Sequence, residues 1–77
     1  MKFVYIQHAE DMAKERNISK KLTEDVINNP EKIVTSKFGR KIAQRIVNGK
    51  LLRVVHEKQN GIFIVITAYY TKPERYG

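Results

Sequence analysis

The chain has 77 residues, a length at which only one small hydrophobic core can form, so we expect a single domain over residues 1–77. It contains no cysteine, which excludes a disulfide framework and a cysteine-based zinc site. Its net charge of +7, from 15 Lys and Arg against 8 Asp and Glu, favours nucleic acid, an acidic protein or an anionic membrane as a partner without choosing among them.

The N-terminal third predicts one strand followed by two short helices. Residues 2–6 (KFVYI) are β-branched and aromatic, which is typical of a strand. A helical pattern then runs to Asn17, a residue that accepts the left-handed conformation at a helix end. Ser19 is the expected N-cap of the second helix, which ends before Pro30 because the residue preceding a proline avoids helical geometry. Helices this short need tertiary packing, so we expect both on an apolar sheet face.

The rest of the chain predicts four strands. Residues 31–38 form a weak strand, and residues 41–70 contain three apolar runs separated by Asn-Gly pairs at 48–49 and 60–61. Asn and Gly tolerate the positive φ angles of a type I′ turn, so this stretch predicts an antiparallel meander. We expect an irregular tail at residues 71–77. The element order is β-α-α-β-β-β-β, an α+β fold with two N-terminal helices on one face of a mainly antiparallel sheet.

The two turns predict a register in which Arg45 faces Leu52, His56 faces Val65, and Leu52 faces Tyr69. Directly opposed residues project to the same side, so this register divides the meander into two faces. The nearly apolar face, which we expect the helices to cover, consists of Ile42, Gln44, Ile46, Leu51, Arg53, Val55, Ile62, Ile64, Ile66, Ala68 and Tyr70. The mixed face consists of Lys41, Ala43, Arg45, Val47, Lys50, Leu52, Val54, His56, Phe63, Val65, Thr67 and Tyr69.

The mixed face is the candidate site. Its cations and tyrosine could hold phosphates and stack a base, although cations are also normal on a solvated sheet face, where they oppose aggregation. Aliphatic side chains among the cations favour a contact surface. The catalytic candidates are His8, Arg45, His56 and Tyr69. The candidates for RNA contact are Lys37, Arg40, Lys41, Lys50, Arg75 and Tyr76.

The two histidines could form an acid and base pair for RNA cleavage through the 2′-hydroxyl, although nothing in the sequence brings them together. His8 follows the first strand and could instead cap the helix or fill a gap at the core edge. His56 could instead be an exposed strand residue. Without Asp, Glu or Cys at ligand spacing the pair does not predict a metal site, and we expect no cofactor. The longest apolar run, residues 62–66, is too short to cross a membrane, and the first residues do not begin a signal peptide, so we expect a cytoplasmic protein without a membrane partner.

Two further arginines need partners. Arg53 falls on the predicted apolar face, where we expect it to pair with a helix carboxylate such as Glu10, Asp11 or Glu24. Arg16 is expected to fold back onto helix carbonyl groups. In the tail, the 75–76 pair could swing over the sheet edge and contact phosphate, or have no fixed structure, as chain ends often do.

Short segments over nearly the whole chain carry a family resemblance: HAEDMAKERNIS (8–19), DVINNPEKI (25–33), GR (39–40), GKLLRVVHE (49–57), VITAYY (65–70) and ERY (74–76). They resemble a small bacterial and archaeal family that is similar to the BrnT and RelE/ParE-like toxins. The resemblance implies that helices cover one sheet face while the other face and the C-terminal segment meet RNA. RelE-like ribonucleases carry Lys and Arg on the meander and a Tyr near the end, and the comparable residues are Lys37, Lys41, Arg45 and Tyr69 or Tyr76.

We therefore expect a RelE-like, metal-independent endoribonuclease of the toxin type that acts on mRNA, free or on the ribosome. Lys41 and Arg45 would stabilise the transition-state charge, while His56 or His8 would act as base or acid. The resemblance also implies an acidic antitoxin as a protein partner. ParE-like relatives use the same fold against gyrase, so the family predicts the fold more closely than the activity. The alternative is a non-catalytic module that binds RNA or a protein with the same face.

Overall fold

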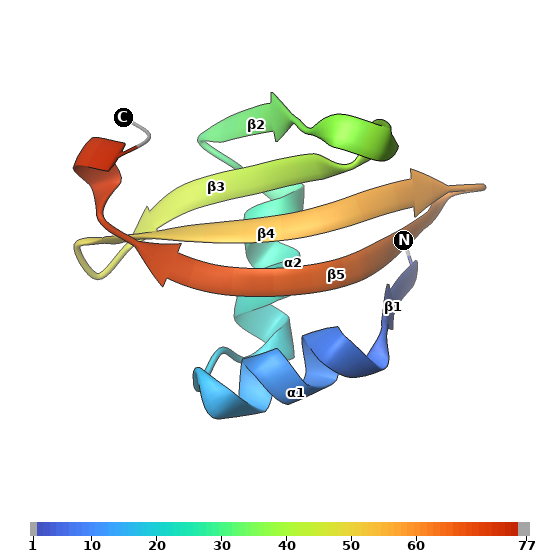
Figure 1. The fold of residues 1–77 in the computed structure, drawn as a ribbon, viewed down its shortest axis with the longest axis horizontal. Helices are drawn as coiled ribbons and strands as arrows, with labels where there is room; N and C mark the ends of the chain where they lie inside the picture. The colour runs from blue at the N-terminus through green and yellow to red at the C-terminus, as the bar shows by residue number, and fades with distance from the viewer. Residues whose placement is uncertain (1, 76–77) are drawn as a thin grey trace.

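The computed structural model describes residues 2–75, excluding the side chain of Arg75 (Figure 1). Its elements are β1 (Lys2–Tyr5), α1 (Gln7–Glu15), α2 (Lys20–Asn28), β2 (Lys32–Thr35), η1 (Lys37–Gly39), β3 (Lys41–Val47), β4 (Lys50–Gln59), β5 (Ile62–Thr71) and η2 (Pro73–Arg75), where η denotes a 3-10 turn. This order confirms the predicted α+β class and the β-α-α-β-β-β-β arrangement. The strand expected at 31–38 is shorter than predicted, and η1 follows it. In the tail expected from residue 71, β5 ends and η2 follows.

The sheet has five strands in the order β1-β5-β4-β3-β2. β1 pairs in parallel with β5, and the other neighbouring strands pair antiparallel. The first strand of the chain therefore lies beside the last one. Both helices lie on one side of the sheet in Figure 1, where α1 packs along β5 and α2 packs against β3 and β4. No helix within residues 2–75 is long and apolar enough to cross a membrane.

Local chemistry at the turns confirms the predicted element ends. Asn48 and Asn60 have φ angles of 52° and 50°, and the glycine after each also has positive φ, as type I′ turns require. Asn17 ends α1 with φ 56°. The Leu22 backbone N–H donates to the Ser19 hydroxyl at 3.0 Å, which makes Ser19 the N-cap of α2.

A β-bulge in β5 changes the predicted register. The β3–β4 pairing is as predicted, and His56 faces Val65 across β4 and β5. Val55 then faces Thr67, so that one extra residue of β5, Ile66, lies between these two pairs. A bulge of this kind reverses the side to which the following residues point. Tyr69 therefore faces Arg53, and the prediction that it faces Leu52 is wrong.

The buried core lies on the mixed face, so the predicted choice of face is wrong although the packing of both helices on one face is confirmed. The core cluster consists of Ala9, Ile18, Val26, Ile27, Ala43, Leu52, Val54, Val65 and Ala68. Ala43, Leu52 and Val54 are each 0% exposed. Two charged residues of this face lie at its margins: Lys41 begins β3 and is exposed, while Arg45 reaches the edge of α2. An apolar centre with a polar rim can thus serve as a core face.

The opposite side of the sheet, which we call the open face, has no helix of residues 2–75 packed on it and is turned toward the viewer in Figure 1. From the register, it includes Lys2, Val4, Lys32, Val34, Ile42, Gln44, Ile46, Leu51, Arg53, Val55, Glu57, Gln59, Ile62, Ile64, Thr67, Tyr69 and Thr71. Ile46 is 41% exposed there. Within the described residues no helix covers this side of the sheet, although Gln44, Leu51 and Arg53 on it are buried.

The two faces differ in their predicted contribution to stability. Leu52→Ala removes a fully buried side chain and should lower the free energy of unfolding by about 3 kcal/mol, because a cavity remains beneath the helices. Ile46→Ala on the open face should cost about 1 kcal/mol or less. Urea unfolding of both variants measures the difference. A larger loss for Ile46→Ala would mean that the core lies on the other face.

Candidate functional site

Arg45, a predicted catalytic residue, joins the sheet to α2. Its Nη2 atom lies 2.6 Å from Oδ2 of Asp25, and its Nη1 donates to the Asn29 carbonyl at 3.3 Å. The hydrogen bond from Arg45 holds the pKa of Asp25 below its ordinary value. The guanidinium therefore binds the C-terminal turn of α2 and is directed away from the open face.

The two histidines do not form a pair. His56 is 3% exposed, its Nδ1 is 3.2 Å from the Val54 carbonyl oxygen, and its ring meets the edge of Phe63 at 5.6 Å between centroids. Burial lowers the pKa of His56; the Val54 hydrogen bond opposes this shift, and the charge of Lys41 adds to it. His8 is exposed on α1, and within residues 2–75 no hydrogen bond or ring contact joins it to His56. A buried His56 cannot reach an RNA phosphate.

The predicted RNA contacts are spread over both ends of the sheet. Lys37, Arg40 and Lys41 lie around the start of β3, and Arg40 Nε is 3.2 Å from Oε1 of Glu57. Lys50 lies at the opposite end, at the start of β4. The Arg75 side chain and Tyr76 lie outside the described part of the chain. The cations that the sequence groups on one face thus do not gather at one place.

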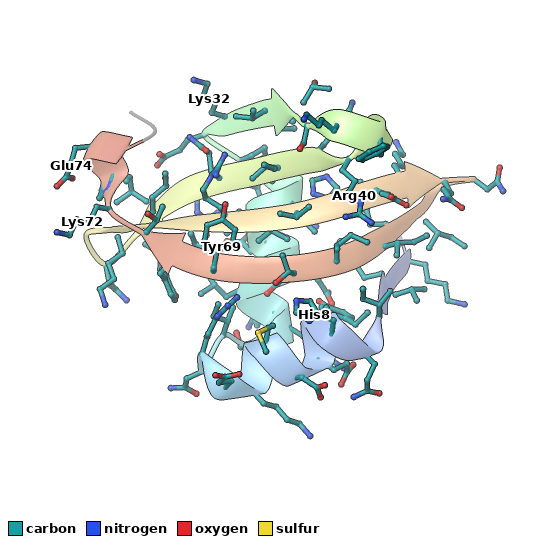
Figure 2. The ribbon with its side chains drawn as sticks, viewed as in Figure 1. His8, Lys32, Arg40, Tyr69, Lys72 and Glu74 are labelled. Atoms are coloured by element: carbon teal, nitrogen blue, oxygen red, sulfur yellow. The ribbon has the colours of Figure 1, made fainter. Side chains whose placement is uncertain are left out.

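A different set of polar residues crosses the open face. Lys32 of β2 faces Gln44 of β3, Gln44 faces Arg53 of β4, and Arg53 faces Tyr69 of β5. We call these four residues the cross-strand row. Figure 2 shows Tyr69 extending from β5 over β4 on this face, with Lys32 at the far edge of the sheet. The row brings a lysine, an amide, a guanidinium and a phenol together on four adjacent strands.

Hydrogen bonds connect the centre of the cross-strand row. Arg53 Nε donates to Oε1 of Gln44 at 3.1 Å, and its Nη1 donates to the Tyr69 hydroxyl oxygen at 2.7 Å. Gln44 and Arg53 are each 5% exposed, Tyr69 is half-buried and Lys32 is exposed. The predicted pairing of Arg53 with a helix carboxylate is wrong, because Arg53 points away from the helices.

This geometry prepares Tyr69 to donate a proton. The phenol oxygen accepts a hydrogen bond from Arg53, so the phenolic hydrogen can be directed to another acceptor. The guanidinium fixes a positive charge directly beside that hydroxyl, where its shielding from water strengthens its electrostatic effect. An anionic group bound over Tyr69 would meet both a hydrogen-bond donor and a buried positive charge.

The sequence predicts part of the cross-strand row, since Tyr69 is a catalytic candidate and Gln44 is predicted to face Arg53. The first Asn-Gly turn predicts that Gln44 faces Arg53, as observed. A polar pair on an otherwise aliphatic face indicates a candidate site. Tyr69 was placed on the other face because the bulge at Ile66 has no Gly or Pro to mark it. For Lys32, the sequence predicts only a place in the weak strand at residues 31–38.

Arg16 also differs from its prediction. Its Nη1 donates to the Ala68 carbonyl oxygen at 2.7 Å, whereas we expected it to bind carbonyl groups of its own helix. β1 covers only the part of β5 from residue 62 to residue 65, so the Arg16 side chain satisfies a carbonyl beyond the end of β1.

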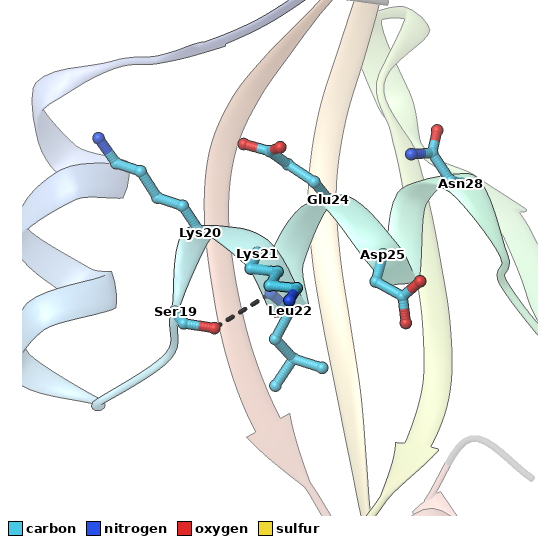
Figure 3. Close-up of a pocket in the computed structure, with 7 residues that line it drawn as sticks. All are labelled: Ser19, Lys20, Lys21, Leu22, Glu24, Asp25 and Asn28. Atoms are coloured by element: carbon cyan, nitrogen blue, oxygen red, sulfur yellow. Dashed lines mark hydrogen bonds between the residues drawn. The ribbon is translucent and has the colours of Figure 1, made fainter.

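A pocket of about 710 Å³ runs along the outer side of α2 (Figure 3). It is lined by Ser19, Lys20, Lys21, Leu22, Glu24, Asp25 and Asn28. Its carboxylates already have partners: Glu24 accepts from the Tyr5 hydroxyl at 2.7 Å, and Asp25 pairs with Arg45. Burial and the Glu24 contact raise the pKa of Tyr5. Among residues 2–75 no group of three or more His, Asp or Glu side chains is placed to hold a metal ion. The open face therefore remains the better candidate.

Fold and site together define a small basic α+β protein with one open sheet face crossed by a polar row. A family model described as "Domain of unknown function (DUF4258)" matches residues 5–70, and the chain belongs to this family. Neither the curated proteins nor the solved structures gave a significant match. The matched region contains the whole cross-strand row.

The buried His56 should make stability depend on pH. Its pKa is lowered from 6.5 in the folded state, so below about pH 6.5 the unfolded chain binds more protons. The free energy of unfolding should therefore decrease as the pH falls from about 7.5 to 5.5. His56→Gln, which retains every other titratable group, should reduce this decrease in urea unfolding measured across the same range. Equal pH dependence in both proteins would contradict the burial of a neutral imidazole.

Proposed function

We propose that this protein is a toxin-type endoribonuclease whose RNA binds on the open face, across the cross-strand row. The observation that carries the proposal is the contact between Arg53 and the Tyr69 hydroxyl in the middle of the uncovered side of a basic protein. The order of elements adds support, since the RelE/ParE and BrnT-like toxins that the sequence resembles also have a strand, a helix pair and an antiparallel sheet. In this proposal the histidines and Arg45 have no catalytic part.

A single RNA strand is expected to cross the sheet along the row. Lys32 is exposed and would bind one phosphate, since ion pairs with phosphates supply most of the affinity in such complexes. Tyr69 would bind the scissile phosphate or its leaving oxygen. Arg53 is too buried for direct contact, so it is a positioning residue that orients Tyr69 and supplies positive charge beneath the phosphate.

The reaction that fits these groups is transesterification. The RNA 2′-oxygen attacks phosphorus and releases its proton to water, while the bond from phosphorus to the 5′-oxygen breaks. Tyr69 donates its proton to the departing 5′-oxygen and regains one from water. The products are a 2′,3′-cyclic phosphate and a 5′-hydroxyl. Negative charge that develops on the phosphate oxygens is stabilised by the charge of Arg53.

A non-catalytic module is the second candidate, and the 5% exposure of Arg53 favours it. A guanidinium so shielded does not contact phosphate in the way that arginines of ribonuclease sites do. The same open face, with Ile46 exposed beside it, would then bind RNA without cleaving it or dock an acidic protein such as an antitoxin.

Cleavage of a labelled mixed-sequence RNA at low salt tests the proposal, with free RNA and with ribosome-bound mRNA as substrates. Tyr69→Phe should reduce the rate about 100-fold while RNA binding is retained, because the variant loses only the proton donor. Tyr5→Phe is the matched control, since this hydroxyl binds Glu24 on the helix side and its loss should leave cleavage unchanged.

Arginine variants test the location of the site in the same assay. Arg53→Gln should reduce cleavage strongly, whereas Arg45→Gln, which removes the same charge from the helix-covered side, should not once the stability of both is matched by temperature. Cleavage by the wild type that survives Tyr69→Phe would refute the assigned chemistry. Binding that weakens as salt rises, with no product from either substrate, would favour the non-catalytic module.

A further inference from the structure

We propose that the end of the sheet at the β3–β4 turn holds a second site, which binds a nucleotide phosphate; as a contact for an RNA strand, it rests on the proposed function. The site is a pocket of about 390 Å³ lined by Arg16, Asn17, Val47, Asn48, Lys50 and Tyr70. This volume is in the range typical of small-ligand sites, about 300–1,000 Å³. We call it the hairpin-end site.

Charge points to an anionic ligand. The hairpin-end site contains two cations, Arg16 and Lys50, and no carboxylate of residues 2–74 lines it. A neighbouring pocket, also of about 390 Å³, shares Lys50 and Tyr70 with it and adds Lys72, together with Glu74. Three cations therefore surround this end of the sheet against one carboxylate.

The cations of the hairpin-end site lack a carboxylate partner within the described residues. Within residues 2–75 the ion pairs involve Lys20, Arg40 and Arg45, each with a carboxylate, and none involves the cations of the hairpin-end site. Leu51 faces Thr71 in the β4–β5 ladder, so Lys50 and Lys72 flank the same pair at the strand ends. Like charges at such positions repel one another, and a bound anion would offset the repulsion.

Part of the hairpin-end site is fixed by the fold. The hydrogen bond from Arg16 Nη1 to the Ala68 carbonyl anchors the guanidinium and leaves its other N–H groups to donate elsewhere. Asn17 and Asn48 have φ angles of 56° and 52° because each ends a regular element. A partly pre-formed site binds its ligand with less loss of conformational entropy.

The remaining lining residues favour a nucleotide over a bare anion. Tyr70, which is half-buried against the core, lines both pockets, and an aromatic ring is a group on which a base can stack. The amide side chains of Asn17 and Asn48 offer both donors and acceptors to the edge of a base.

The hairpin-end site lies next to the cross-strand row along the chain. Tyr69 and Tyr70 are consecutive in β5 and point to opposite sides of the sheet, and Thr71 lines the pocket that Lys50 and Lys72 share. An RNA strand that leaves the open face beside Tyr69 would thus place a flanking phosphate near Lys50. The site would position the substrate without taking part in the chemistry.

NMR titration of backbone amides tests the hairpin-end site independently of cleavage, with adenosine 5′-monophosphate as the probe. We expect shifts at residues 16–17, 47–50 and 70–72, and much smaller shifts with adenosine or with inorganic phosphate alone. Lys50→Gln should weaken this binding at least about threefold. Lys58→Gln, at the other end of β4, is the matched control and should bind normally.

RNA measurements then separate the two proposals. Lys50→Gln should raise KM with little change in kcat, because it removes binding that is equal in the ground and transition states. It should also reduce the slope of log affinity against log salt by about 0.7, the value of one phosphate contact in a single strand. Unchanged KM and salt slope in Lys50→Gln, or equal shifts with phosphate alone, would overturn the hairpin-end site even if Tyr69 proves catalytic. Nucleotide binding without any RNA cleavage would uphold the site and refute the nuclease.

Discussion

The extra residue that the bulge places in β5 determines what each side of the sheet presents. With Ile66 accommodated between the two pairs, Val65 and Ala68 both point toward the helices and complete the core. The same shift directs Tyr69 to the opposite side, where its hydroxyl meets Arg53. Without the bulge, either the core or the polar row would lose its β5 member. Stability and the candidate chemistry therefore depend on the same irregularity of the backbone.

Helix packing explains why a face with cations can be buried. The helices contact the middle of the sheet, where Ala43, Leu52 and Val54 have no exposed surface. Charged side chains such as Arg45 lie at the edge of this contact. Arg45 uses that position to hold the last turn of α2 through Asp25. Arg45 at the rim thus contacts a helix. In the middle of the open face, which no helix of residues 2–75 covers, the polar residues instead bond to one another. A buried arginine there is costly unless it is hydrogen-bonded, and the bonds to Gln44 and Tyr69 offset part of that cost.

Local sequence signals predicted the elements well, whereas the predicted register along β5 and the predicted choice of the covered face are wrong. The Asn-Gly turns, the Ser19 cap and the Asn17 helix end depend only on nearby residues, and all three are confirmed. The assignment of β5 residues to a face assumes that successive side chains alternate between the two sides of the sheet. A bulge interrupts this alternation, and one without Gly or Pro leaves no mark in the sequence. The number of apolar residues on each face also predicted the wrong face for the helices. Whether helices can cover a face depends on where its polar residues lie more than on how many it has. The pairing of Gln44 with Arg53 was predictable from the first turn, whereas the participation of Tyr69 and Lys32 required the three-dimensional register.

The parallel pairing of β1 with β5 has a consequence for how the chain folds. Among the described strands β1 pairs only with β5, some sixty residues later in the chain, and α1 packs on that same strand. Neither can be stabilised until the meander exists, whereas the meander itself needs only short-range pairings across its two tight turns. During synthesis on the ribosome, β1 and α1 therefore have no strand to pack on until β5 has left the exit tunnel. Folding of this domain should begin with the meander of β3, β4 and β5 and end with the docking of β1 and α1 on β5.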